Sequence, residues 1–294
     1  MPMLPDYSTL SPTRRLAATL VDGLRKELAL TPKPGLVDCI SNGSHPDLSY
    51  ALMSASIELL SSYFAASAEA LEAGCGVETL RELGKCFEQS MLVCFQSNTH
   101  RGALFLGGIL LAAVERSPGG DEAALSYAVA TVAKQLFDKR VPHDTIGAKV
   151  RRQYAAGGIV TESLQGLPSV FEFSLPALRD GLDRGMSQRD ARLLAMAVLM
   201  QTVEDTTTLR RCGPLGLAMV CEDGRRLENI LYAGKSPVSY LKDADDRYRE
   251  RRLTMGGVAD LLAVTIALHH FFLPIDGNGE GQVPQGRDLS IGCY

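Results

Sequence analysis

The chain has 294 residues, 46% of them hydrophobic and 22% charged, with a formal net charge of −4 at pH 7. A chain of this length and apolar content can bury one substantial core, so we expect a single domain. The slight acidity excludes the broad basic surface that nucleic-acid-binding proteins use, so any bound phosphate must be held by local groups.

Apolar residues recur at helical spacing along almost the whole chain, which predicts an all-α, multi-helix domain. Leucines at every fourth position from Leu16 to Leu28 mark the first helix, and the run Met53–Phe64 marks the second. Ser187-x-x-Asp190 predicts a capping box, and no strand pattern or fixed repeat competes with these signals. Further helices are expected at 77–96, 102–115, 121–138, 144–155, 170–184, 188–203, 236–251 and 257–272.

The two ends differ from this helical block. We expect an N-terminal extension over 1–13, an all-helical domain over 14–273, and a Gly-rich flexible tail over 274–294. The tail contains Asp276-x-Asn278-x-Glu280-Gly281, which imitates the opening of a calcium loop. Position twelve would be Arg287 and no helices flank it, so we interpret this stretch as a solvated tail.

The loop after the first helix carries the first candidate site residues. Two prolines hold the backbone on either side of Lys33 and present its ammonium, a natural partner for phosphate, on a stiff loop. Asp38 stands beside apolar residues, as metal ligands, caps and salt-bridge partners do. Ser44 and His45 are expected at the N-terminus of the next helix, a possible anion site. An exposed lysine and an ordinary turn with a cap remain alternatives.

The stretch Asn98-Thr99-His100-Arg101-Gly102 precedes an apolar helix and is the most informative motif. Asn98 or Thr99 can cap that helix, whose free N–H groups and dipole attract anions, and Arg101 adds a positive charge. The motif indicates a site for a phosphorylated ligand. An ordinary cap followed by a solvated arginine would have the same sequence.

The pair Glu204-Asp205 follows an apolar run and is expected near the C-terminal end of a helix. The helix dipole disfavours acids there by about 0.3–1 kcal/mol each, which indicates a compensating cation: Arg210, Arg211 or a magnesium ion. A frayed end with solvated acids is the alternative. Asp260 lies one turn into an apolar helix, where it suits the dipole or, if buried, needs a metal or a charged partner.

The remaining candidate residues are less specific. His143 and Glu162 bracket a basic segment that has no distinct message by itself. The adjacent residues His269 and His270 cannot point the same way, so a paired metal site is not expected. No glycine-rich phosphate loop follows a strand, which excludes the standard nucleotide-binding folds.

Cysteine usage and the apolar runs indicate a cytoplasmic protein with no membrane partner. The seven cysteines are odd in number and form no Cys-x-x-Cys pair, as is typical of reduced thiols. Residues 1–6 lack the features of a signal peptide, and the apolar runs 103–114 and 261–273 are too short or too polar to cross a bilayer.

Four motifs follow one another along the chain: Leu30-Thr31-Pro32-Lys33-Pro34-Gly35-Leu36-Val37-Asp38, Gly43-Ser44-His45-x-Asp47, Asn98-Thr99-His100-Arg101-Gly102-Ala103-Leu104-Phe105 and Gly256-Gly257-x-Ala259-Asp260-Leu261-Leu262-Ala263-Val264. In this order and spacing they resemble the triphosphoribosyl-dephospho-coenzyme A synthase family across about residues 15–270. That family is all-helical and makes the precursor of the prosthetic group on the acyl carrier proteins of citrate lyase and malonate decarboxylase.

The resemblance implies transfer of the triphosphoribosyl group of ATP, with Mg²⁺, to the ribose 2′-hydroxyl of 3′-dephospho-coenzyme A, releasing adenine. Such a reaction needs a triphosphate clamp and a carboxylate that activates the hydroxyl. The resemblance implies catalytic acids at Asp38, Glu162 and Asp205, and magnesium ligands at Glu204, Asp205 and Asp260. Substrate-binding positions by the same resemblance are Lys33, Ser44, His45, Asn98, Thr99, His100, Arg101, His143, Arg211, Gly256 and Gly257.

Several positions depart from the family pattern. Asp144 stands in place of a glycine, Val160 in place of an arginine, Cys212 in place of a glycine, and Met255 in place of a proline. Loss of an arginine from a polyphosphate site removes a charge-assisted hydrogen bond of about 1.5–3 kcal/mol. The alternatives are therefore an enzyme with the same ATP clamp and a different acceptor, or a non-catalytic helical regulator that binds nucleotide.

Overall fold

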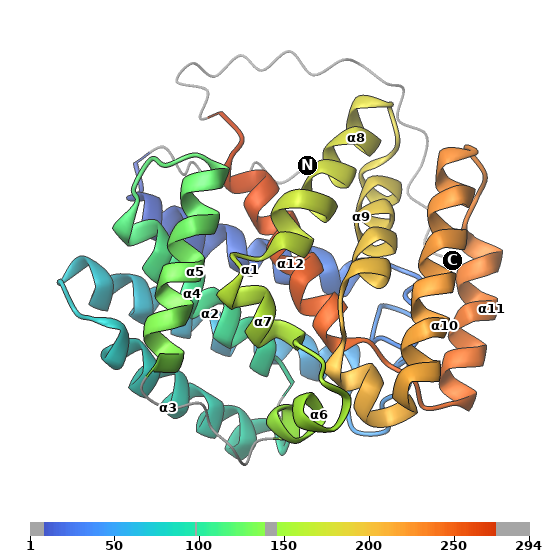
Figure 1. Cartoon of the computed structure of the whole chain (residues 1–294), viewed down its shortest axis with the longest axis horizontal. Helices are drawn as coiled ribbons and strands as arrows, with labels where there is room; N and C mark the ends of the chain where they lie inside the picture. The colour runs from blue at the N-terminus through green and yellow to red at the C-terminus, as the bar shows by residue number, and fades with distance from the viewer. Residues whose placement is uncertain (1–8, 98, 139–145, 275–294) are drawn as a thin grey trace.

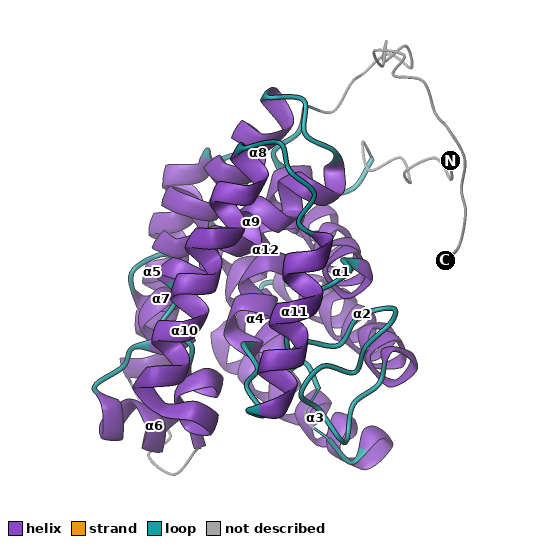
Figure 2. Ribbon diagram, turned by 90° about the vertical axis from the view of Figure 1, so that its right-hand side faces the viewer, coloured by secondary structure: helices purple, strands orange, loops and turns teal. Residues whose placement is uncertain are grey.

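The computed structural model describes residues 9–97, 99–138 and 146–274, and within them it contains helices and no strand. The predicted all-α fold is confirmed (Figures 1 and 2). The predicted extension and tail lie largely outside the described residues, as does the calcium-loop-like stretch. The elements are α1 (Pro12–Ala29), α2 (Tyr50–Glu72), α3 (Val77–Phe95), α4 (Arg101–Arg116), α5 (Glu122–Asp138), α6 (Ile146–Tyr154), α7 (Gly158–Leu164), the π-helix η1 (Ser169–Ser174), α8 (Leu175–Asp183), α9 (Gln188–Thr202), α10 (Thr206–Tyr232), α11 (Val238–Glu250) and α12 (Gly256–Phe271).

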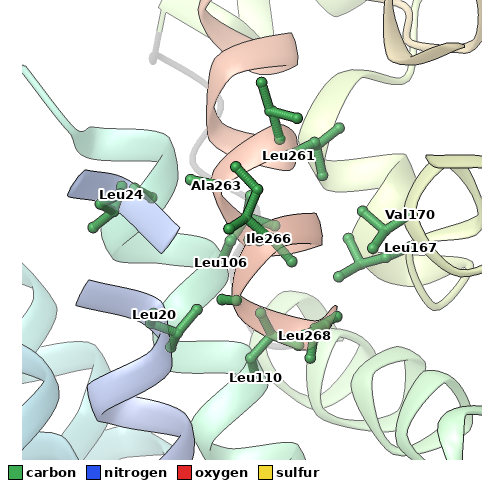
Figure 3. Packing of buried hydrophobic residues seen from close by; sticks show 14 of the residues in the cluster. Leu20, Leu24, Leu106, Leu110, Leu167, Val170, Leu261, Ala263, Ile266 and Leu268 are labelled. Carbon is green, nitrogen blue, oxygen red and sulfur yellow. The ribbon is translucent and has the colours of Figure 1, made fainter. Parts of the chain in front are cut away.

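Helix α12 is the centre of the core. It is apolar on all sides, the pattern of a helix that is buried all round, and it packs against α1, α4, α9 and η1. Figure 3 shows Ile266 and Leu268 of α12 among Leu20 of α1, Leu110 of α4 and Val170 of η1. Helices α4 and α12, which carry Arg101 and Asp260, therefore share one core.

Helices α1 and α12 approach closely at Gly23. A Cβ at this position would overlap the backbone oxygen of Ala263 and lie 3.0 Å from the Cβ of Ala267. Glycine allows the two helices to cross without a side chain between them, and this crossing positions the C-terminal half of α1 beside the start of α12.

Two helices were missing from the prediction. Helix α7 is short, and α10 contains Gly213 and Pro214, two residue types that commonly end a helix. The chain kinks there, with Gly213 at φ 64°, and then continues as a helix. The predicted helix at 170–184 corresponds to an unbroken helical stretch over 169–183, of which the first six residues form the π-helix η1 and the rest form α8.

The N-caps of α9 and α4 test two further expectations. Ser187 accepts the N–H of Asp190 at 3.1 Å, which confirms the predicted cap of α9. The expected cap of α4 by Thr99 is wrong, since His100 occupies the N-cap position and makes no side-chain capping bond. Asn98, the other expected cap of this helix, lies outside the described residues. Helix α2 begins at Tyr50 after the capping residue Ser49.

The late start of α2 corrects one more expectation. Ser44 and His45 precede the Ser49 cap and belong to the loop, so they do not lie at a helix N-terminus. In the described part of the chain, no helix is both long enough and apolar enough to span a membrane.

Candidate functional site

The N-termini of α4, α7, α10 and α12 meet in one region. A Cβ on Gly102, in the first turn of α4, would overlap the carboxylate of Asp260 in the first turn of α12 and lie 3.1 Å from Ile159 of α7. A Cβ on Gly158, at the start of α7, would lie 2.6 Å from Thr206, at the start of α10. The glycines thus allow four positive dipole ends to approach one another.

Asp205 joins the N-termini of α10 and α12. Its Oδ1 accepts the N–H groups of Thr207 at 2.7 Å and Thr208 at 2.9 Å, and its Oδ2 accepts that of Val258 at 3.1 Å. Gly257 leaves room for this, because a Cβ there would lie 3.0 Å from Oδ2. Burial raises the pKa of Asp205, and the N–H groups oppose that shift.

Glu204 and Asp205 do follow the C-terminal end of a helix, as expected, but the expected conflict with the helix dipole is wrong for Asp205. Helix α9 ends at Thr202, and Asp205 is the N-cap of α10, where the dipole favours a carboxylate. The error arose because the predicted helices did not include α10. No compensating cation is needed to explain these acids.

Glu204 and Glu162 lie at the α7 edge of the site. Glu204 is exposed and accepts the N–H of Gly157, the N-cap of α7, at 2.6 Å. Glu162 is half-buried and accepts the hydroxyl of Ser169 at 2.6 Å and its N–H at 3.2 Å. Burial raises the pKa of Glu162, and the charges of Glu172 and Glu204 add to the shift.

Asp260 caps a neighbouring helix rather than its own. Its carboxylate is half-buried and accepts the N–H of Ala103, which serves α4 in place of a cap from that helix's own residues. Loss of water raises the pKa of Asp260 well above its ordinary value, and the negative charges of Glu27 and Asp205 raise it further. Glu27 and Asp205 therefore lie close enough to act on the charge of Asp260.

Lys33 is paired inside the protein. Its side chain is 1% exposed, and its Nζ donates to the Oε1 of Glu27 at 2.5 Å and to the backbone oxygen of Glu27 at 2.6 Å. The expectation that the stiff loop presents this ammonium to a ligand is wrong in this structure. Burial raises the pKa of Glu27, and the charge of Lys33 opposes the shift.

Sequence reasoning missed Glu27. The sequence carries a signal for this residue, which is an acid on the apolar face of a helix. Glu27 follows Leu24 by three residues and so lies on the same face, and both side chains are buried. An acid on such a face needs a charged partner.

Asp38 organises the loop that carries Lys33. Its Oδ2 accepts the N–H of Lys33 at 2.9 Å, and its Oδ1 accepts those of Ile40 and Ser41, each at 2.9 Å. Both oxygens are therefore engaged with the backbone.

Helix α11 fastens the same loop from the other side, through residues that sequence reasoning also missed. Asp245 accepts the N–H of Gly35 at 2.8 Å and the hydroxyl of Ser41 at 3.0 Å. Ser44 donates to the backbone oxygen of Tyr248 at 3.1 Å.

His45 and Arg211 form a second group of site residues, which hydrogen bonds through Thr254 and Thr208 link to Asp205. Arg211 donates to the backbone oxygen of Ser44 at 2.9 Å and lies 3.4 Å from the Nδ1 of His45. Since arginine can only donate, Nδ1 is the acceptor and Nε2 carries the proton toward the Thr254 hydroxyl at 2.9 Å. Burial and the charge of Arg211 lower the pKa of His45 to about 4, so the ring is neutral at pH 7.

The residues before α4 are partly turned inward. His100 is buried, its Nδ1 lies 2.9 Å from the Ser56 hydroxyl, and burial lowers its pKa to about 4. Thr99 also contacts the Ser56 hydroxyl. Arg101 is half-exposed and pairs with Glu88 of α3 at 3.0 Å. Asn98 and His143 lie outside the described residues.

Known proteins match this chain over nearly the whole of its helical part. A family model described as ATP:dephospho-CoA triphosphoribosyl transferase matches residues 13–274. A "Probable 2-(5''-triphosphoribosyl)-3'-dephosphocoenzyme-A synthase" of Pseudomonas putida is 36% identical over 262 residues, covering 86% of this chain and 93% of the relative. The protein of the same name from Stutzerimonas stutzeri is 37% identical over 267 residues, covering 88% and 92%. No solved structure matches.

Proposed function

Since the chain belongs to the ATP:dephospho-CoA triphosphoribosyl transferase family, we propose that this transferase moves the triphosphoribosyl group of ATP onto the ribose 2′-hydroxyl of 3′-dephospho-coenzyme A. The hydroxyl oxygen forms a bond to C1′ of the ATP ribose, and the bond from C1′ to the adenine nitrogen breaks. Adenine leaves with the bonding electron pair and takes up a proton. The proton of the attacking hydroxyl passes to a carboxylate of the protein.

The meeting of four helix N-termini is the observation that carries this proposal. A triphosphate needs concentrated hydrogen-bond donors, and helix N-termini supply N–H groups together with a favourable dipole. Gly102, Gly256 and Gly257 carry no side chain here and lie against Asp260, Thr207 and Asp205, respectively. We assign the triphosphate to this region, with Arg101 at its edge.

Asp260 is the carboxylate that fits magnesium best. Mg²⁺ binds through one or two carboxylates together with substrate phosphate oxygens, and no group of three or more potential ligands is found among the described residues. The charge of Glu27 and Asp205 around Asp260 favours a cation there, and the exposed Glu204 is a second candidate. When bound, the ion would neutralise charge on the triphosphate. Asp205 keeps its capping role, because its oxygens already accept three N–H groups.

Glu162 is our candidate for the group that accepts the hydroxyl proton. Its pKa is raised toward neutral pH, which makes the carboxylate a stronger base than that of an ordinary glutamate. Asp38 fits this role less well, because its oxygens accept three backbone N–H groups that shape its loop, whereas those of Glu162 accept only the N–H and the hydroxyl of Ser169. Lys33 and His100 support the site from inside, Lys33 by balancing the charge of Glu27.

Adenine release tests the proposal directly. Purified protein is incubated with ATP, magnesium and 3′-dephospho-coenzyme A, and free adenine is measured by chromatography beside the Pseudomonas putida relative. We expect adenine to appear in step with the adduct. If the relative releases adenine and this protein does not, the proposed function is wrong.

One substitution in the site favours a second candidate, an enzyme with another acceptor. Val160 occupies the third position of α7, beside the meeting helix N-termini, where the family pattern has an arginine. Adenine release with other hydroxyl compounds but not with dephospho-coenzyme A would select this candidate. Stabilisation by ATP without any turnover would instead indicate a nucleotide-binding regulator.

A further inference from the structure

A surface cleft lies beside the loop that carries His45, outside the cluster of helix N-termini. Its volume of ≈ 590 Å³ falls in the range of small-molecule sites, about 300–1,000 Å³. Neither the triphosphate nor the magnesium ion of the proposed reaction uses it. The cleft is lined by Gly43, Ser44, His45 and Pro46 of the loop and by Asp246, Arg249 and Glu250 of α11.

We propose that this cleft binds the acceptor through its nucleotide diphosphate, an inference that rests on the proposed function. The reaction requires two nucleotides at once, one that is attacked at its ribose and one that supplies the hydroxyl. With the triphosphate of ATP at the helix N-termini, the acceptor needs a second site within reach of the first.

A chain of hydrogen bonds joins the cleft to the helix N-termini. The wall residue His45 bonds the hydroxyl of Thr254 at 2.9 Å, and the backbone oxygen of Thr254 accepts from the Thr208 hydroxyl at 2.9 Å. The N–H of Thr208 in turn donates to Asp205 at 2.9 Å. Three hydrogen bonds therefore connect His45 in the wall of the cleft to Asp205 at the N-terminus of α10.

The charges of the cleft suit a diphosphate with sugar hydroxyls better than a triphosphate. Arg249 is 55% exposed and lies 3.6 Å from Asp246, a long ion pair that leaves its guanidinium available for bidentate contact with phosphate. Asp246 and Glu250 can accept hydrogen bonds from ribose hydroxyls. His45 is neutral at pH 7 and adds no positive charge. With more acids than bases, the cleft disfavours the higher charge of a triphosphate.

Calorimetric titration of the purified full chain separates the two substrates. Wild type, R249A, R249K and R226A are titrated with 3′-dephospho-coenzyme A and, separately, with ATP and magnesium. Arg226 is a matched control, an exposed arginine on α10 paired with Glu222. We expect R249A to raise the Kd for dephospho-coenzyme A about tenfold without changing that for ATP, because it removes a charge-assisted contact. R249K should recover part of the loss, and R226A should bind both ligands as wild type does.

Two results would overturn the inference: R249A binding dephospho-coenzyme A as tightly as wild type, or R249A weakening both ligands equally. The proposed function fails separately. If the wild type releases no adenine but R249A still loses affinity for dephospho-coenzyme A, the acceptor site stands and the transferase reaction does not.

Discussion

The pair of Glu27 and Lys33 shows how single residues support this site. Both side chains are buried, and the pair lies beside Asp260, whose pKa is raised partly by the charge of Glu27. Removing one member of a buried ion pair leaves the other charge without compensation, which costs far more than losing an exposed pair.

Replacing Glu27 by glutamine tests this difference. We expect Glu27→Gln to lower the free energy of unfolding by about 3–5 kcal/mol in urea denaturation, because Lys33 stays buried without its counter-charge. The control is Glu58→Gln, which removes an exposed pair with Arg25 and should cost about 0–1 kcal/mol. Equal effects of the two substitutions would mean that Lys33 finds another partner or reaches solvent.

His100 makes stability sensitive to acid. Burial lowers its pKa from 6.5 to about 4, so between these values the unfolded chain binds a proton that the folded chain does not. The contribution of His100 to stability is therefore complete above pH 6.5 and is lost as the pH falls through this window.

His100→Gln should remove this part of the pH dependence. Between pH 7 and pH 5, the free energy of unfolding of wild type should fall by about 2 kcal/mol more than that of the variant. Denaturation curves of both proteins at each pH measure the difference directly, because the contributions of the buried acids cancel. Parallel pH profiles would show that folding does not change the pKa of His100.

At the scale of helices, close packing depends on a few small residues. The crossing of α1 and α12 at Gly23 leaves no room for a side chain, and these helices carry Glu27 and Asp260, respectively. A disturbance at this crossing would reach both the core and the site.

Gly23→Ala should therefore lower the free energy of unfolding by about 1–3 kcal/mol, the usual cost of adding atoms to a well-packed core. The obstacle is a backbone oxygen, which cannot rotate away. Gly76→Ala is the control, because a Cβ there meets nothing within 4 Å. If chemical denaturation gives the two variants the same stability, the helices are free to separate at Gly23.

Across the whole molecule, local periodicity predicted most of the helices and failed where local signals conflict. The buried leucines of α1 and the apolar α12 follow helical spacing over four or more turns. Gly213 and Pro214 concealed α10, and without α10 Asp205 was assigned to the wrong helix end. Glu27 and Asp245 escaped notice because their partners are set by the tertiary fold.

The motifs in the sequence located the site more accurately than they described its residues. Asp205, Gly257 and Asp260 do lie together around the start of α12. The environment of Lys33, by contrast, depends on the packing of α1 against the loop, which spacing along the chain does not reveal.

The central claim is that the meeting helix N-termini and Asp260 hold the triphosphate and its magnesium ion. The most direct test is the rate of adenine release from ATP and dephospho-coenzyme A by wild type, Asp260→Asn and Asp243→Asn, with thermal melts to confirm folding. Asp243 is an exposed aspartate on α11 and serves as the control. We predict that Asp260→Asn lowers the rate at least about 100-fold, as losing a key transition-state contact does, and that Asp243→Asn retains the wild-type rate. A folded Asp260→Asn variant that releases adenine as fast as wild type would contradict the account.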